Sequence, residues 1–248
     1  MKKNIYNYYY MKIRGIKQKF IELLPEDINI CLLGLQGSRM LGLAQNNDAD
    51  YDYRGIYIAN RDEVISLNKP KEQYEYCDSR DGEIDYVIYE IEKFIRLCLK
   101  GNPSILHLLF VPKYNVKDNV GDFLIKNKNV FLGEKQIRAS FAGYALSQIL
   151  YLKRNHKFQG RQKKEKHIRH CFILFDTGQE LLETGKITLP LKNPEKYIEI
   201  SKIENEDKLI KMFEKRDKEF KKCKSCLSLE PNFYLANQIL ISIRNDEV

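Results

Sequence analysis

The chain has 248 residues, of which 43% are hydrophobic and 31% charged, a balance typical of a globular protein and not of a disordered or fibrous one. Lysine and arginine number 42 against 34 aspartates and glutamates, and the resulting charge of +8 favours anionic partners such as nucleotides or nucleic acid. No apolar run approaches the ~20 residues that span a bilayer, and the N-terminus lacks the apolar stretch of a signal peptide, so we expect a cytoplasmic protein with no membrane partner.

The first half of the chain alternates between short apolar strands and helices. Apolar residues at helical spacing predict a helix over residues 13–24, before the turn at Pro25. Strands are expected over three apolar or alternating runs, 28–35, 51–58 and 84–88. One or two helical turns over 40–44 separate the first two strands. A longer helix over 90–100 ends at Gly101-Asn102-Pro103, a C-cap followed by a breaker.

Beyond residue 104 the strand signals are weak and helical periodicity dominates. The expected helices cover residues 105–110, 120–126, 137–152, 167–184, 207–226 and 233–243. We therefore predict an α+β protein, with a small mixed-sheet lobe in residues 1–115 and a helical C-terminal domain in residues 116–248.

The six cysteines are scattered, and reduced thiols are the expectation for a chain of this size inside a cell. Cys223 and Cys226 form a single CxxC. A zinc site would need a second pair of cysteines or histidines at suitable spacing, and none is nearby. The pair is therefore interpreted as two thiols carried by a charged helix.

Two aspartates stand where the second expected strand begins. Asp50 and Asp52 are two residues apart, and alternate residues of a strand point to the same side. Two carboxylates held close together repel each other unless a cation lies between them, and hard oxygen ligands suit Mg²⁺. The pattern therefore predicts that Asp50 and Asp52 bind magnesium.

Gly37 and Ser38 directly follow the first expected strand. Glycine lets the backbone approach a phosphate closely, and the helical turn after it would offer unpaired N–H groups at the positive end of the helix dipole. Ser38 adds a hydroxyl donor. Arg39 is either a further phosphate contact or an ordinary surface residue. The segment thus predicts a cradle for the phosphates of an NTP such as ATP.

A third carboxylate is expected because two-metal transfer of a nucleotidyl group needs two ions ~3.5–4 Å apart. Asp85, on the third expected strand, is the candidate, both as a metal ligand and as the base that accepts a proton from an incoming hydroxyl. Glu83 shares its face by alternation and is the fallback. An Asp-x-Asp alone is usually a solvated turn, so the prediction depends on its combination with Gly37, Ser38 and the later carboxylate.

These motifs together resemble a known group of proteins. The segments LGLQGSRMLGLA (33–44) and DADYDYRGIY (48–57) are similar to the predicted nucleotidyltransferases of the DNA polymerase beta superfamily of bacteria and phages, some of them associated with RNA repair. The similarity continues in GNPSIL (101–106) and ELLETGKI (180–187), and covers roughly residues 30 to 190.

The resemblance implies a nucleotidyltransferase lobe followed by a helical domain. It assigns phosphate binding to Gly37 and Ser38 and metal binding to Asp50, Asp52 and, less directly, Asp85. It also points to Lys166 and His170, one helical turn apart in a basic segment, as nucleotide contacts of the second domain.

The sequence departs from the family pattern at three positions. Ala49 replaces a serine before the first metal-binding aspartate, His107 stands near a usual glutamate, and Ile173 occupies the place of an arginine one turn beyond His170. His107 is expected to pack in the core and not to react.

The predicted activity is Mg²⁺-dependent attack of a hydroxyl on the α-phosphate of an NTP, with release of pyrophosphate. RNA or tRNA is the candidate acceptor. Two alternatives stay open: a non-catalytic nucleotide- or RNA-binding protein that keeps the fold, and a toxin–antitoxin-type nucleotidyltransferase that modifies a protein or tRNA. The sequence leaves the oligomeric state open.

Overall fold

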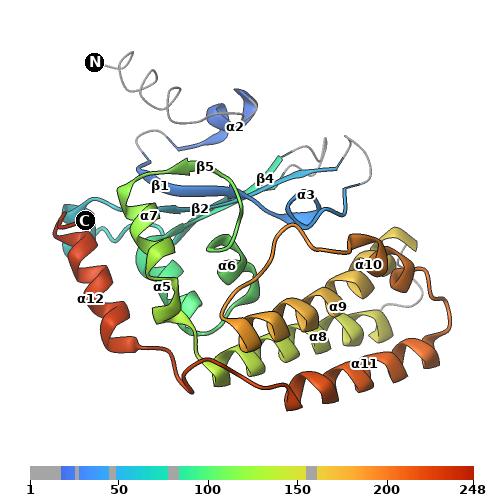
Figure 1. Cartoon of the computed structure of the whole chain (residues 1–248). Coiled ribbons are helices and arrows are strands. Elements are labelled where there is room, and N and C mark those ends of the chain that lie inside the picture. The colour runs from blue at the N-terminus through green and yellow to red at the C-terminus, as the bar shows by residue number, and fades with distance from the viewer. Residues whose placement is uncertain (1–17, 26–27, 45–48, 78–83, 155–160) are drawn as a thin grey trace. The chain divides into compact units, whose positions relative to one another are not determined.

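The computed structural model describes residues 18–25, 28–44, 49–77, 84–154 and 161–248 (Figure 1). Contacts divide the chain into two compact units. The first unit comprises residues 1–96, 111–128 and 234–248, and the second comprises 97–110 and 129–233. This division is not a single cut near residue 115, because the last helix groups with the N-terminal residues. The two-domain boundary at 115 stays a prediction.

The first unit is built around a five-stranded mixed sheet. Its strands are β1 (Ile30–Leu35), β2 (Tyr51–Tyr57), β3 (Gln73–Cys77), β4 (Ile84–Glu90) and β5 (Tyr114–Lys117), in the order β3-β4-β2-β1-β5. The central pair β2 and β4 is parallel, and the other three pairs are antiparallel. Its helices are α2 (Gln18–Leu23), α3 (Gly37–Leu41), α4 (Arg61–Ile65), α5 (Ile91–Leu99), α7 (Asn119–Lys126) and α12 (Phe233–Arg244). The last residues of α5 belong to the second unit.

Alternation along β2 places Tyr51, Tyr53 and Tyr57 on one face of the sheet and Asp52 on the other. Tyr53 is buried in the core, where its ring lies 4.6 Å from that of Phe20 on α2. Tyr86 of β4 shares this face and donates a hydrogen bond from its hydroxyl to the Leu23 carbonyl at 2.7 Å. Residues one position away, including Asp52 and Asp85, therefore point to the opposite face.

The second unit consists of helices. Its elements are α6 (Pro103–Leu108), the short 3₁₀ helix η1 (Lys128–Phe131), α8 (Glu134–Arg154), α9 (Arg161–Thr184), α10 (Pro194–Ser201) and α11 (Glu206–Lys222). Helices α8 and α9 run side by side, and Gly178 permits this, because a β-carbon there would lie 2.6 Å from the Phe141 ring. Phe141, Phe175 and Phe220 are fully buried in its core.

The α+β fold class is confirmed, with a mixed sheet in the N-terminal region and mostly helices after it. In the part of the chain that the structure describes, five elements were not predicted: α4, β3, β5, η1 and α10. Helix α11 ends at Lys222, so Cys223 and Cys226 lie beyond it, and the expectation that a helix carries these thiols is wrong. Within the described ranges, every helix is too short or too polar to cross a lipid bilayer.

Candidate functional site

Gly37 and Asp52 meet at the end of β1. The Gln36 backbone N–H donates to the Asp52 carbonyl at 2.7 Å, which holds the chain leaving β1 against β2. Gly37 has φ +65°, a conformation that favours glycine. A β-carbon on Gly37 would lie 1.9 Å from Asp52 Oδ2, so the glycine makes room for this carboxylate. The structure thus brings together two of the residues that the sequence assigned to one site.

Asp52 and Asp85 are direct neighbours on the parallel strands β2 and β4, where they pair in register. Residues paired in this way point to the same face of the sheet. Asp50 is exposed and directly precedes β2, and its place on the same side as Asp52 stays a prediction. Glu83, the alternative to Asp85, lies outside the described residues.

Arg39 braces this corner and is not a solvated surface residue. Its guanidinium donates two hydrogen bonds to the Ala49 carbonyl, from Nε at 2.9 Å and from Nη2 at 2.6 Å. Its Cζ also lies 3.9 Å from the centre of the Tyr51 ring, within the range of a cation–π contact. Arg39 therefore ties α3 to the residues on either side of Asp50, and phosphate contact by Arg39 stays a prediction.

Gln36 is a residue that the sequence did not single out. Its side chain is 6% exposed, and among the residues that the structure describes its Nε2 has no hydrogen-bond partner. An unsatisfied buried donor costs about 1–3 kcal/mol, so the Gln36 amide is a buried polar group in need of an acceptor. The available signal was its position, directly before Gly37-Ser38 at the end of a strand.

The fit of these residues to magnesium is partial. Asp52 and Asp85 are adjacent carboxylates, and the Asp52 carboxylate fills the space that a side chain on Gly37 would occupy. Within the described ranges, no group of three or more histidine, cysteine, aspartate or glutamate side chains is close enough to hold a metal. The donor set is of the hard oxygen type that suits Mg²⁺, and the three-carboxylate arrangement of Asp50, Asp52 and Asp85 stays a prediction.

The two sequence-predicted residues of the second unit both lie on α9. Lys166 is exposed. Burial lowers the pKa of His170 to about 4, helped by His167 and Lys166 nearby. His170 is therefore neutral at neutral pH, and it would meet a phosphate as a hydrogen-bond donor and not as a cation. His167 is fixed by a 2.6 Å contact between Nδ1 and Gln148 Oε1 and by the Tyr151 ring, whose centre is 4.3 Å away.

Two residues of the second unit that depart from the family pattern, Ile173 and His107, are buried. Ile173 is 1% exposed and lies in the helical core. His107 is 5% exposed, with the Phe141 ring edge-on to it at 6.4 Å, which confirms that it packs. Burial lowers its pKa to about 4, and its Nε2 has no partner among the described residues.

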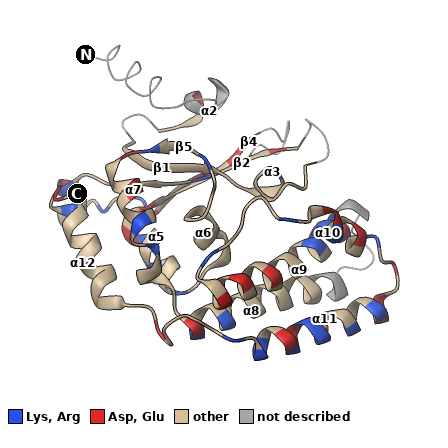
Figure 2. Cartoon of the chain, in the orientation of Figure 1, with Lys and Arg blue, Asp and Glu red and all other residues tan. Residues whose placement is uncertain are grey.

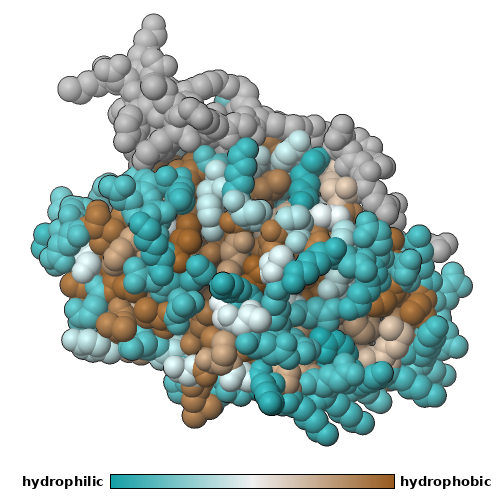
Figure 3. All heavy atoms as spheres, viewed as in Figure 1, coloured by the Kyte–Doolittle hydropathy of each residue, from teal (hydrophilic) through white to brown (hydrophobic). Residues whose placement is uncertain are grey.

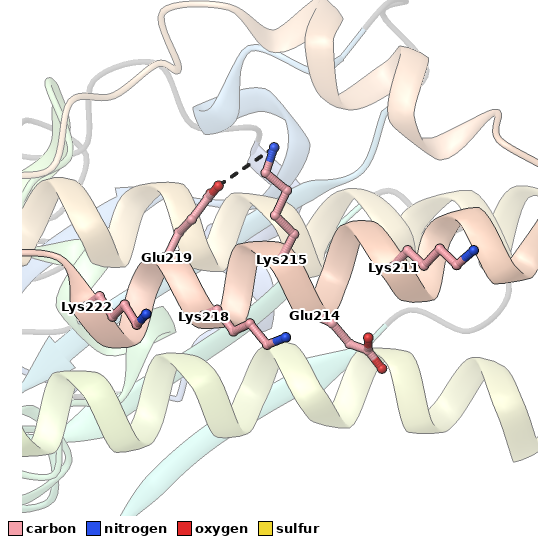
Figure 4. A pocket seen from close by; sticks show the side chains of 6 residues that line it. All are labelled: Lys211, Glu214, Lys215, Lys218, Glu219 and Lys222. Carbon is pink, nitrogen blue, oxygen red and sulfur yellow. Dashed lines mark ion pairs between the residues drawn. The ribbon is translucent and has the colours of Figure 1, made fainter.

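A shallow depression of about 360 Å³ runs along α11. The side chains around it are four lysines and two glutamates of α11, and Lys215 forms an ion pair with Glu219 (Figures 2 and 4): Lys211, Glu214, Lys215, Lys218, Glu219 and Lys222. In the space-filling view the surface over this helix is hydrophilic (Figure 3). The depression has the character of a solvated helix face, and we assign it no chemistry.

The chain is similar to a known protein family over most of its length. The model of the RNA repair pathway DNA polymerase beta family matches residues 13–232. An uncharacterised protein of Methanocaldococcus jannaschii is 33% identical over 81 residues, which is 32% of this chain and 32% of that protein, so the match spans about a third of the relative. A crystal structure of a nucleotidyltransferase-like protein from Exiguobacterium sibiricum aligns over 96% of this chain and 75% of its own, at 14% identity and a TM-score of 0.31.

Proposed function

Because the chain belongs to the RNA repair pathway DNA polymerase beta family, we propose that it is a Mg²⁺-dependent nucleotidyltransferase. It moves a nucleoside monophosphate from an NTP to a hydroxyl acceptor, with an RNA hydroxyl as the acceptor class, and releases pyrophosphate.

One observation carries the proposal: the Asp52 carboxylate lies against a glycine that has no room for a side chain. Gly37 holds a positive φ, and its neighbour Gln36 donates to the Asp52 carbonyl. Asp85 stands beside Asp52 on the adjacent parallel strand. This corner therefore joins a backbone turn able to approach phosphate with carboxylates able to hold a cation.

Each residue of the corner has a role in this proposal. Asp50, Asp52 and Asp85 would hold Mg²⁺, which when bound neutralises charge on the phosphates and orients them. Gly37 and Ser38 receive the phosphates, and the Gln36 amide donates to an oxygen of the nucleotide. Asp85 accepts the proton of the attacking hydroxyl. Arg39 keeps the Asp50 segment in position through the Ala49 carbonyl.

The second unit supports the nucleotide in this proposal. Lys166 supplies positive charge to the phosphates or the leaving pyrophosphate. His170, neutral because burial lowers its pKa, supplies a hydrogen bond. Both residues lie on α9, four positions apart and on one helix face.

The test is transfer of label from α-labelled NTPs to RNA acceptors in the presence of Mg²⁺. Asp52→Asn keeps the size of the side chain and removes its charge, and we expect it to lower transfer at least about 100-fold, as loss of a key electrostatic contact does in other enzymes. Asp62→Asn is the matched control, because Asp62 is an exposed carboxylate in the first turn of α4.

Equal transfer by the wild type and Asp52→Asn would reject Asp52 as a ligand. If the wild type binds NTP and never transfers label to any acceptor, the protein is a non-catalytic nucleotide binder. Label found on protein or tRNA instead of repaired RNA ends would move the assignment to the toxin-type activity.

A further inference from the structure

Cys223 and Cys226, the two cysteines of the CxxC motif, lie outside the buried core, where their thiols can react. Cys223 is half-buried at the C-terminal end of α11, and Cys226 is exposed three residues later. Both are free thiols. Cys98 and Cys171 are different, because burial raises the pKa of each thiol and keeps it in the unreactive protonated form.

A guanidinium group is fixed beside the Cys223 sulfur. Arg138 of α8 donates from Nη1 to Cys223 Sγ at 3.5 Å and from Nη2 to the Cys223 carbonyl at 2.7 Å. Its Nε is held by Glu134 Oε1 at 2.7 Å, so the group cannot swing away freely. The thiol itself donates to the Phe220 carbonyl at 3.1 Å. Arg138 and the Phe220 carbonyl therefore hold the Cys223 sulfur in one position, and a fixed position favours its attack on a neighbouring sulfur in disulfide exchange.

The other end of the motif is also held in place, while its sulfur stays open. The Cys226 backbone N–H donates to the Leu182 carbonyl at 2.8 Å, in the last turn of α9. Gly185 follows this helix with φ +68° and has no side chain that could cover the Cys226 sulfur. A β-carbon added to Gly185 would still lie 4.0 Å from Cys226 Sγ. Cys226 is therefore the thiol that a reagent from solvent reaches first.

We propose that Cys223 and Cys226 form a dithiol site that exchanges with low-molecular-weight disulfides such as glutathione disulfide and closes to an intrachain disulfide. The Cys226 thiolate attacks one sulfur of the glutathione disulfide, forms a mixed disulfide and releases one glutathione thiolate. The Cys223 thiolate then attacks the Cys226 sulfur and releases the second glutathione. The protein loses two hydrogens, and one glutathione disulfide is reduced to two glutathiones.

Closure has a structural consequence at the end of α9. A disulfide needs its two Cα atoms within about 7 Å, so closure limits how far apart the two ends of the four-residue segment can lie. Arg138 holds the Cys223 end, and the Leu182 carbonyl holds the Cys226 end. Loss of the hydrogen bond from Cys226 to Leu182 on closure would expose that amide to exchange with solvent.

The experiment equilibrates the full chain with buffers of defined glutathione to glutathione disulfide ratio, followed by alkylation and mass spectrometry. We expect a peptide that is lighter by two hydrogens and blocked to alkylation at both positions. Cys226→Ser and Cys223→Ser should each leave the other cysteine as a mixed disulfide or a free thiol. Cys77→Ser is the matched control, an exposed cysteine on β3 whose removal should leave closure unchanged.

Alkylation of both Cys223 and Cys226 in the wild type at every ratio would overturn the proposal, and so would an oxidised product that needs Cys77. The role of Arg138 as a positioning residue has its own readout. Arg138→Met should slow the second step about tenfold, so that the mixed disulfide at Cys226 accumulates, whereas Arg138→Lys should keep most of the rate. Equal rates in all three proteins would remove Arg138 from the proposal. No arm of this test depends on nucleotidyl transfer.

Discussion

Replacing Gly37 by alanine places a methyl group where the Asp52 carboxylate lies. The new β-carbon would start 1.9 Å from Asp52 Oδ2, and real contacts of this kind essentially never fall under 3.0 Å. The carboxylate or the turn must therefore shift by at least about 1.1 Å. Alanine at φ +65° adds strain of about 1–2 kcal/mol, because a side chain crowds the backbone there.

Both effects can be measured. We expect Gly37→Ala to lower the free energy of unfolding by about 1–2 kcal/mol, read from urea denaturation. A displacement of about 1 Å in a catalytic group can reduce a rate about 100-fold, so label transfer from NTP should fall by that factor or more.

Gly143→Ala provides the matched control. Gly143 lies in α8 with no atom within 4 Å of an added β-carbon, so alanine should stabilise the chain by about 0.5–1 kcal/mol through helix propensity. Its label transfer should equal that of the wild type. If Gly37→Ala unfolds at the wild-type urea concentration, the close contact with Asp52 is not present in solution. If it is destabilised and still transfers label normally, the corner is not the active site.

Two further predictions concern buried ionisable groups. Burial lowers the pKa of His107 to about 4, whereas the unfolded chain has the ordinary value of 6.5. Between these two pH values the unfolded chain takes up a proton at His107 and the folded chain does not. The free energy of unfolding is therefore retained above pH 6.5 and falls as the pH approaches 4, with a loss of about 2 kcal/mol at pH 5. His107→Leu should lack this part of the acid sensitivity in urea denaturation at pH 7 and pH 5, and an unchanged pH dependence would contradict it. Arg244 pairs with Glu90 at 2.6 Å, and the Glu90 side chain is only 5% exposed, so Arg244→Met should lower the free energy of unfolding by about 3 kcal/mol. Lys221→Met, which breaks an exposed pair with Asp217, should change it by less than about 1 kcal/mol, and similar losses in the two variants would refute the argument.

The sequence predicted those strands whose burial imposes a clear pattern. β2 and β4 lie in the middle of the sheet, with neighbours on both sides, and their alternation was visible in the residues. β3 and β5 are the two edge strands and have five and four residues. An edge strand pairs on one side only and can be short and polar, so QYEYC and YNVK carried no strand signal that stood out from a loop.

Some features of the candidate site could likewise be predicted from the sequence, and others could not. The corner of Gly37 and Asp52 depends on a turn and one strand pairing, both local enough to be read from the spacing of Gly-Ser and Asp-x-Asp. The role of Arg39 at the Ala49 carbonyl was not predictable, because it needs the rotamer of a long side chain across a loop. The neutral state of His170 was not predictable either, since its burial comes from packing within a helical unit whose residues are distant in sequence.

The place of α12 has a consequence for the order in which the protein can fold during synthesis. Its Arg244 completes the surroundings of Glu90, on a strand made more than a hundred residues earlier, and the second unit is encoded largely between the two. The residues of the helical unit are therefore synthesised before Arg244, which is the counter-ion of Glu90 in the sheet. Until then the Glu90 carboxylate lacks its ion-pair partner, so the sheet reaches its final stability only after the last helix emerges.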